Sequence, residues 1–243
     1  MIPAERMICP GWQESRMSRI AVIPARGGSK GIPKKNLALL QGQPMISYTI
    51  HAARQSGLFD GILVSSDDPE ILDYAMGCGV LGIQRPAALA RDDSPTEPTV
   101  LHAMDWWAEA QRSEPEVVCL LQPTSPLRTS RDILDAEKLF TQCGADSLLS
   151  VTEKREFHWR VDGGRAIPAW DISHRPRRQE LEPIYVENGA IYITRSSIYR
   201  EQKNRLGGKM VLYPMPPERS VDIDEPFDLR LAEGLLHSQG IQS

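Results

Sequence analysis

The chain has 243 residues, of which 41% are hydrophobic and 25% are charged, as is usual for a globular protein with one domain or one domain and a small appendage. Its net charge of −4 gives no overall attraction to nucleic acid or to an anionic membrane, and no apolar run approaches the roughly 20 residues of a membrane span. The four cysteines are scattered without a Cys-x-x-Cys pair, which argues against a zinc site. Together with the lack of a signal-peptide pattern in the first 18 residues, they lead us to expect a cytoplasmic protein.

In chain order, short apolar runs alternate with helical patterns. We expect residues 1–17 to be a disordered N-terminal extension and residues 18–243 to form the folded domain. Strands are predicted at Ile20–Ile23, Gly61–Val64, Val117–Leu121, Ser147–Val151 and Glu187–Thr194. Helices are predicted at Leu37–Leu39, Pro44–Ser56, Pro69–Gly77, Thr96–Gln111 and Ser130–Gln142. This alternation favours an α/β fold, with a mostly parallel, Rossmann-like sheet covered by helices on both faces.

The pattern changes after Thr152. Residues 153–183 carry many charges, two tryptophans and the pair Gly163-Gly164, with little helical or strand period. We therefore predict an inserted arm or lid in this part of the chain.

A glycine-rich, basic loop follows the first predicted strand directly. Its glycines let the backbone turn sharply and expose N–H groups, while Arg26, Lys30, Lys34 and Lys35 add positive charge. The loop has neither the P-loop spacing Gly-x-x-x-x-Gly-Lys-Ser/Thr nor the dinucleotide fingerprint Gly-x-Gly-x-x-Gly. Clustered N–H donors and cations nevertheless predict a polyphosphate site, and a basic surface turn is the alternative.

The segment Ala25–Asn36 resembles the opening signature of the acylneuraminate cytidylyltransferases, Ala-Arg-x-x-Ser-Lys-Gly-(Ile/Leu)-Pro-x-Lys-Asn. These enzymes make CMP-sialic acids, and the resemblance runs from about Ser18 to the C-terminus. It implies a nucleotidyltransferase type A-like fold in which 153–183 is a dimerisation arm. It also implies that Arg26, Lys30 and Lys35 neutralise the triphosphate of CTP. Further nucleotide contacts are implied at Ala25, Gly27, Gly28, Ser29 and Asn36.

Two more matches concern the base and the sugar. Arg85 and Thr96 fit the family segment Arg-Pro-x-x-Leu-Ala-x-Asp and its following hydroxyl, which implies that they read cytosine. A surface ion pair is the alternative for Arg85. The run Leu120–Arg128 matches Leu-Leu-Gln-Pro-Thr-Ser-Pro-Leu-Arg completely, with a rigid turn as the alternative. The match implies that Gln122 and Thr124 contact the sugar acid, with Ser125 nearby and Arg128 orienting the loop.

Two acidic pairs are candidates for a metal site. Asp222 and Asp224 alternate on a strand-like stretch, so both side chains are expected on one face, with Ile223 facing the core. Two carboxylates make a hard-oxygen site suited to Mg²⁺, and the family uses this Asp-x-Asp for its metal. Helix-capping acids before Pro226 are the alternative. For the second pair, Asp67-Asp68, we favour a loop and helix cap over a metal site.

The remaining matches concern the sugar and the oligomer. Asn188-Gly189 opens the family run Asn-Gly-Ala-Ile-Tyr-Ile and is expected to have a structural role with some contact to the sugar, or else to form a turn. The basic segment of the arm resembles one that contacts the sugar carboxylate, with Arg178 as the best match and Arg177 second. In that family the arm reaches across a dimer, which implies a homodimer whose arms complete the neighbouring sites.

These matches predict a Mg²⁺-dependent cytidylyltransferase. The anomeric hydroxyl of a nine-carbon 2-keto sugar acid attacks the α-phosphate of CTP, and pyrophosphate leaves. A legionaminic, pseudaminic or Kdo-type substrate is the near alternative. A nucleotide-binding regulatory protein without catalysis is an alternative of another class. A hydride-transferring Rossmann enzyme is disfavoured, because its glycine fingerprint is missing.

Overall fold

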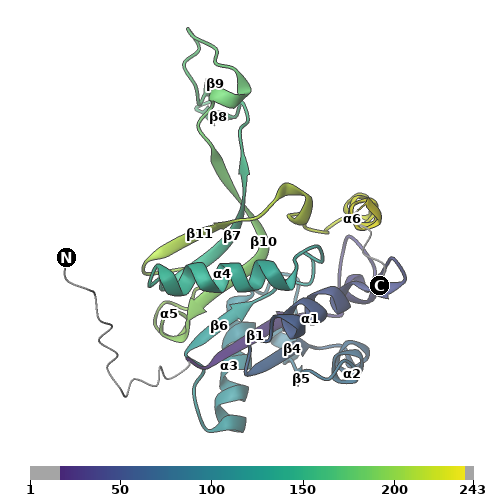
Figure 1. The fold of residues 1–243 in the computed structure, drawn as a ribbon. Helices are drawn as coiled ribbons and strands as arrows, with labels where there is room; N and C mark the ends of the chain where they lie inside the picture. The colour runs from purple at the N-terminus through teal and green to yellow at the C-terminus, as the bar shows by residue number, and fades with distance from the viewer. Residues whose placement is uncertain (1–16, 239–243) are drawn as a thin grey trace, which may run out of the picture.

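The structure, a computed structural model, describes residues 17–238 and centres on one seven-stranded sheet. Across the sheet the order is β11-β7-β10-β6-β1-β4-β5 (Figure 1). The strands are β1 (Arg19–Pro24), β4 (Gly61–Ser66), β5 (Leu81–Gln84), β6 (Val117–Leu120), β7 (Ser147–Lys154), β10 (Ile184–Arg195) and β11 (Met210–Pro214). Parallel pairing joins β1 to β4 and β6, β4 to β5, and β7 to β11, whereas β10 runs antiparallel to β6 and β7. The prediction of a mostly parallel sheet is therefore confirmed.

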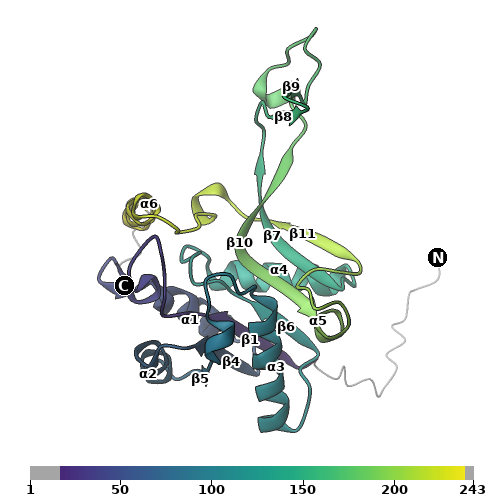
Figure 2. The same cartoon turned by 180° about the vertical axis from the view of Figure 1, so that it is seen from behind.

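Helices cover both faces of this sheet, as predicted. They are α1 (Met45–Ser56), α2 (Pro69–Gly77), α3 (Glu97–Gln111), α4 (Ser130–Gln142), α5 (Ser196–Gln202) and α6 (Pro226–Ser238). Ile50 of α1 and Phe140 of α4 belong to one buried cluster, and Met104 of α3 and Tyr199 of α5 belong to another on the opposite face. Figure 1 shows α1 and α4 in front of the sheet, and Figure 2, which views the molecule from the opposite side, shows α3 and α5 in front of it. Burial of apolar side chains on both faces explains why the central strands are continuously hydrophobic.

One short helix was predicted wrongly. Leu37–Leu39 is not a helix, because only Lys35–Leu37 forms a 3-10 turn (η1) and Leu39–Leu40 is already a strand, β2. β2 pairs antiparallel with β3 (Gln43–Pro44) through a turn at Gln41 and Gly42, whose φ angles of 50° and 80° lie in the left-handed region. The Gly at the second turn position makes this tight hairpin possible, and the hairpin overrides the helical propensity of the leucines.

An arm extends from the sheet beyond the ends of β7 and β10 (Figures 1 and 2). Because β7 runs to Lys154 and β10 begins at Ile184, the inserted segment consists of residues 155–183. It contains the hairpin of β8 (Trp159–Asp162) and β9 (Arg165–Pro168), which turns at Gly163 and Gly164 with positive φ angles.

Aromatic side chains pack against one another in this arm. The Trp170 ring lies 5.0 Å from that of Phe157 and 4.8 Å from that of Trp159, and the Arg175 guanidinium lies over Phe157. The arm therefore has a small apolar cluster of its own.

The structure bears on two further expectations, the lack of a membrane span and the N-terminal extension, only within the residues that it describes. None of the helices described within residues 17–238 has the length and apolar content that crossing a membrane requires. The predicted N-terminal extension covers residues 1–17, and 1–16 lie outside the described residues.

Candidate active site

A cavity of about 270 Å³ lies at the carboxyl ends of β1, β5 and β6, where ligands bind in open α/β sheets. It brings together parts of the chain that are far apart in sequence. Its lining includes these sequence-predicted residues: Arg26, Gly28, Ser29, Lys35, Asn36, Arg85, Thr96, Gln122 and Thr124.

The basic loop is held against the end of β4 by its own backbone. The N–H of Ala25 donates to Ser65 O at 2.9 Å, and the N–H of Gly27 donates to Asp67 Oδ1 at 3.0 Å. The Asn36 side-chain amide donates to Arg26 O at 2.9 Å. The backbone of Ala25 and Gly27 thus attaches the loop to the chain at the end of β4, and neither residue belongs to the cavity lining.

Two cations of the loop converge on one carboxylate. Arg26 Nη1 lies 2.9 Å from Asp92 Oδ1 and donates to Arg91 O at 3.1 Å, while Lys30 Nζ lies 3.1 Å from Asp92 Oδ2. The hydrogen bond from Lys30, helped by the charges of Lys30 and Arg26, lowers the pKa of Asp92. Asp92 therefore balances the two cations at the cavity wall, where an anionic ligand would compete with it for them. Sequence analysis gave Asp92 no role, although it stands in the motif that pointed to Arg85.

Lys35 joins the basic loop to the acidic segment. Its Nζ donates to Asp224 Oδ1 at 2.9 Å and to Ile223 O at 3.0 Å, and its side chain is 14% exposed. The loop also touches this segment at Gly31, where an added Cβ would lie 2.2 Å from Asp224 O. The fold therefore places the predicted metal carboxylates directly beside the predicted phosphate loop.

The acidic segment is not a strand, but the predicted alternation of exposed aspartates with a buried Ile223 is confirmed. Residues 221–224 have no regular secondary structure, and Ile223 is fully buried between two exposed aspartates. The Ile223 N–H donates to Thr124 O at 2.7 Å, which fixes the segment to the 122–128 loop. Asp228 accepts from the N–H groups of Asp224 and Glu225, so the acid that serves the start of α6 is Asp228.

The electrostatics of this segment suit a cation. Although Asp222 as a whole residue is exposed, its carboxyl group is partly shielded from water, and this desolvation raises its pKa. The charge of Asp224 raises the pKa further, and a hydrogen bond from Thr124 opposes both effects. Within residues 17–238 no cluster of three or more His, Cys, Asp or Glu side chains is placed to hold a metal. A cation held by Asp222 and Asp224 would thus take further ligands from water and substrate, as Mg²⁺ does in phosphate-handling sites.

The loop after β6 is held by a buried arginine. Arg128 is 2% exposed, and its Nη1 donates to Ala190 O at 2.9 Å and to Gln122 O at 3.3 Å. Ser125 is fully buried and donates to Asn188 O at 3.3 Å. Gln122 and Thr124 line the cavity, whereas Ser125 and Arg128 support the loop behind them.

Asn188 and Gly189 lie inside β10, so the alternative of a turn before a strand does not hold. The pairing of β10 with β7 shifts register between Glu187 and Tyr192, and Gly189 has a φ of 72°. A Cβ at Gly189 would lie 2.6 Å from Gln122 Oε1. The bulge therefore lets the 122–128 loop approach the strand closely.

Arg85 is buried at 5% exposure, which rules out the alternative of a surface ion pair. Its Nη2 donates to Ser65 O at 2.5 Å and its Nε to Ser65 Oγ at 3.2 Å, while desolvation lowers its pKa to about 10. Thr96 precedes α3 without a side-chain capping bond. Both residues line the same cavity as Arg26 and Lys35, whereas Lys30 is not among its lining residues.

The arm arginines are not brought to this cavity within one chain. Arg178 Nε donates to Arg155 O at 2.8 Å, and Arg177 pairs with Glu180 at 3.1 Å. Both lie in the exposed arm, at the 3-10 turn η3 (Arg178–Glu180) and the residue before it. Neither is among the residues that line the cavity.

A basic glycine loop beside an acidic segment, at one end of a mostly parallel sheet, is an arrangement typical of α/β proteins that bind nucleotides. The sequence profile of the family described as cytidylyltransferase matches residues 20–166, and the chain belongs to that family.

Named relatives are similar over most of this chain. It is 36% identical over 218 residues to N-acylneuraminate cytidylyltransferase A of Danio rerio, covering 88% of this chain and 49% of that protein. It is 33% identical over 225 residues to N-acylneuraminate cytidylyltransferase of Escherichia coli O18:K1:H7, covering 89% of this chain and 52% of that protein. The chain spans about half the length of the curated relatives it matches.

Solved structures confirm the fold. A CMP:2-keto-3-deoxy-manno-octonic acid synthetase complexed with CTP matches with a TM-score of 0.65 at 18% identity, covering 91% of this chain and 99% of that chain. A 4-diphosphocytidyl-2C-methyl-D-erythritol synthase matches with a TM-score of 0.63 at 12% identity, covering 90% of this chain and 99% of that chain. The expected nucleotidyltransferase-like architecture is thus confirmed.

Proposed function

We propose that this chain transfers CMP from CTP to a nine-carbon, sialic-type 2-keto sugar acid, with Mg²⁺, and releases pyrophosphate. The observation that carries the proposal is the contact of Lys35 with Asp224, which sets a phosphate loop and a carboxylate pair side by side. Relatives at 33–37% identity that are named N-acylneuraminate cytidylyltransferase support the substrate class.

The loop cations act on the phosphates. In the free protein Arg26 and Lys30 are paired with Asp92. When CTP binds, they release this carboxylate and bind oxygens of the triphosphate. There they stabilise the leaving pyrophosphate. Gly28 and Ser29 line the same wall and leave room for the phosphates to approach the backbone.

Arg85 and Thr96 bind cytosine, since a guanidinium and a hydroxyl complement its O2, N3 and N4 groups. Gln122 and Thr124 orient the sugar acid so that its anomeric hydroxyl faces the α-phosphate. Asp222 and Asp224 would hold Mg²⁺, which supplies positive charge against the phosphate oxygens.

We further propose a cytoplasmic homodimer in which the arm of one chain completes the site of the other. The free thiols at Cys78, Cys119 and Cys143 support a reducing compartment. The exposed position of Arg177 and Arg178, away from the cavity of their own chain, supports a role toward a neighbouring copy.

A variant of the arm tests this role. Arg178→Ala should raise the KM for the sugar acid by about 10- to 100-fold, because a charged hydrogen bond to the carboxylate is lost, and leave the KM for CTP nearly unchanged. Arg165→Ala, at the far hairpin of the same arm, serves as the control. An unchanged sugar KM in Arg178→Ala would remove this residue from the sugar site.

The activity itself is tested by pyrophosphate release from CTP and Mg²⁺ with N-acetylneuraminate, legionaminate, pseudaminate and Kdo in parallel. Release with N-acetylneuraminate, and not with ATP, GTP or UTP in place of CTP, is the expected result. Pyrophosphate release with only one of the other sugar acids would show that this sugar acid, and not N-acetylneuraminate, is the substrate. CTP binding without release from any sugar would favour the regulatory alternative, and no CTP binding would overturn the proposal.

A further inference from the structure

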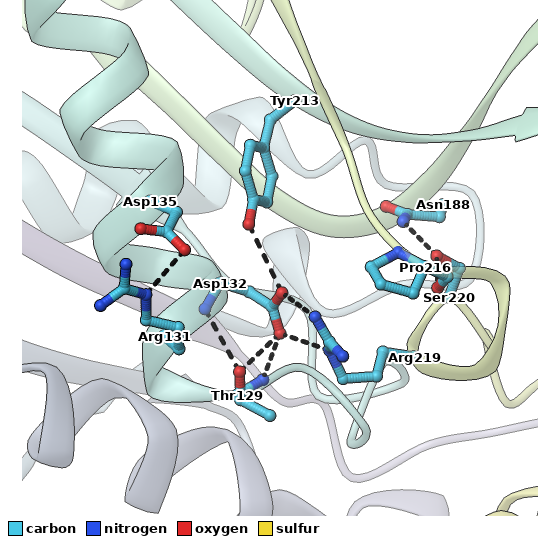
Figure 3. A network of polar contacts seen from close by, with 9 residues as sticks. All are labelled: Thr129, Arg131, Asp132, Asp135, Asn188, Tyr213, Pro216, Arg219 and Ser220. Atoms are coloured by element: carbon cyan, nitrogen blue, oxygen red, sulfur yellow. Dashed lines mark hydrogen bonds and ion pairs between the residues drawn. The ribbon is translucent and has the colours of Figure 1, made fainter.

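An ion pair between Asp132 and the half-buried Arg219 precedes the acidic segment in the chain (Figure 3), and neither residue is among those that line the cavity. Asp132, in the first turn of α4, is 1% exposed and accepts two hydrogen bonds from Arg219, Nε to Oδ2 at 2.9 Å and Nη2 to Oδ1 at 2.8 Å. Thr129 adds hydrogen bonds from its N–H at 2.9 Å and its hydroxyl at 2.6 Å. Burial alone would raise the pKa of Asp132, but the bonds from Arg219 and Thr129 outweigh it and lower the pKa. The carboxylate therefore stays charged and paired.

A second contact fixes the next residue. The Asn188 side-chain amide donates to Ser220 Oγ at 2.9 Å, and the Ser220 hydroxyl donates to Pro216 O at 2.9 Å (Figure 3). The Asn188 oxygen is itself held by the hydroxyl of Ser150 at 2.6 Å. The chain is thus anchored at two successive residues just before the acidic segment begins.

The acidic segment follows at once and is anchored again at Ile223, through its bond to Thr124 and its buried side chain. Asp222 lies between these anchors, with no regular secondary structure to define its backbone. Its direction therefore depends on where Arg219 and Ser220 place the chain.

We propose that the Asp132–Arg219 pair is a positioning device, which aims the carboxylates of Asp222 and Asp224 at the phosphate loop. This inference rests on the proposed function insofar as these carboxylates hold Mg²⁺. A buried ion pair adds little net stability compared with an apolar pair of similar size. The two-pronged guanidinium–carboxylate bond does fix an orientation, and the capped first turn of α4 is a rigid base for it.

The chain offers a matched control on the same helix. Arg19 pairs with Glu137 of α4 through Nε at 3.1 Å and Nη2 at 2.7 Å, and these side chains are 11% and 16% exposed, against 27% and 1% for Arg219 and Asp132. Arg19 begins β1, at the opposite end of that strand from the basic loop. Arg219→Met and Arg19→Met therefore make the same chemical change near to and far from the acidic segment.

Two readouts besides turnover separate positioning from stability. The first is Mn²⁺ binding in the presence of CTP, followed by electron paramagnetic resonance. The second is hydrogen exchange at the Ile223 amide. Arg219→Met should weaken Mn²⁺ binding by about tenfold, as loss of a residue that supports metal ligands does, and should speed Ile223 exchange. Arg19→Met should lower the melting temperature and change neither readout.

Wild-type Mn²⁺ affinity and Ile223 protection in Arg219→Met would overturn the inference. If Arg219→Met does not fold, Arg219→Lys keeps the charge without the two-pronged geometry, and it should show the same two changes to a smaller degree. A wild-type protein that neither binds Mn²⁺ nor releases pyrophosphate would refute the proposed function. The exchange comparison at Ile223 would still decide whether the pair positions the segment.

Discussion

Two acidic segments of this chain have similar composition and different surroundings. In the first, after β4, Asp67 accepts the N–H of Gly27, and Asp68 accepts the N–H of Glu70 at the start of α2. In the second, Asp228 takes the backbone N–H groups. This leaves Asp222 beside Thr124 and Asp224 beside Lys35.

The difference shows that the hydrogen-bond and ion-pair partners of a carboxylate determine whether its role is structural or whether it can bind a ligand. A carboxylate bound to backbone N–H groups satisfies donors that cannot move away, so its role is to build the loop or cap the helix. A carboxylate that faces a lysine side chain and a second carboxylate can exchange those partners for a metal ion. Desolvation beside a like charge is also the arrangement that marks functional sites.

The same substitution in both segments gives the largest contrast. Asp222→Asn should lower Mg²⁺-dependent turnover by about 100-fold or more, because one of two metal-binding carboxylates is lost. Asp67→Asn keeps an oxygen acceptor for Gly27 and should change turnover by less than about threefold, as expected for a neutral hydrogen bond. Initial rates across a Mg²⁺ titration measure both. Equal losses in the two variants would abolish the distinction between the segments.

The contact between the phosphate loop and the second segment can be broken sterically. A Cβ at Gly31 would lie 2.2 Å from Asp224 O, and Gly31 does not have a positive φ, so Gly31→Ala tests the close approach itself. We expect turnover to fall by about 10- to 100-fold, since small displacements of reacting groups have effects of this size. Gly77→Ala, where an added Cβ meets nothing within 4 Å, is the control. Equal rates in the two variants would show that this contact does not matter for turnover.

The first segment should affect stability and not chemistry. Asp68→Ala removes the side-chain cap of α2 and should lower the free energy of unfolding by about 1 kcal/mol, or roughly 2–4 °C in melting temperature. The Asp68 Cβ, which an added Cβ at Gly27 would approach to 2.8 Å, is kept, so turnover of the folded protein should be unchanged. Thermal melts and kcat measured on one preparation test this, and a loss of kcat without a lower melting temperature would contradict it.

The smallest effect concerns pH. Because the folded state raises the pKa of Asp222, it binds the proton more tightly than the unfolded chain, so this group lowers stability as pH rises through its pKa values. Without metal, Asp222→Asn should therefore melt slightly above the wild type at neutral pH. The difference should vanish on acidification below the ordinary pKa of aspartate. A lower melting temperature for this variant at neutral pH would mean that the carboxylate is stabilising.

Much of the fold could be predicted, because its strong signals are local. The ranges of α2 and α4 coincide with the predicted ones, and β1, β4 and β6 fall within two residues of prediction. β5, β11 and α5 were missed, and α6 was anticipated only through capping acids near Pro226, without a range. β5 and β11 lie at the two edges of the sheet. β5 is short and contains a glycine and a glutamine, and β11 is apolar from Met210 to Tyr213 but is exposed at alternate positions, unlike the central strands. The antiparallel direction of β10 was also not predicted, since direction depends on long-range pairing.

The sequence by itself determined the types of residue in the site. A glycine-rich basic loop directly after a strand, a polar turn between prolines and an Asp-x-Asp are local patterns, and each can be recognised without knowing its neighbours. Only the tertiary structure decided which of these groups meet and which side chains are already in use. Ser125 already donates a hydrogen bond to Asn188 O. Asp92 is already paired with Arg26 and Lys30, and Asp132 with Arg219. The physical reason is that hydrogen bonds and charges act over a few ångströms in space, and folding brings together residues that lie far apart along the chain.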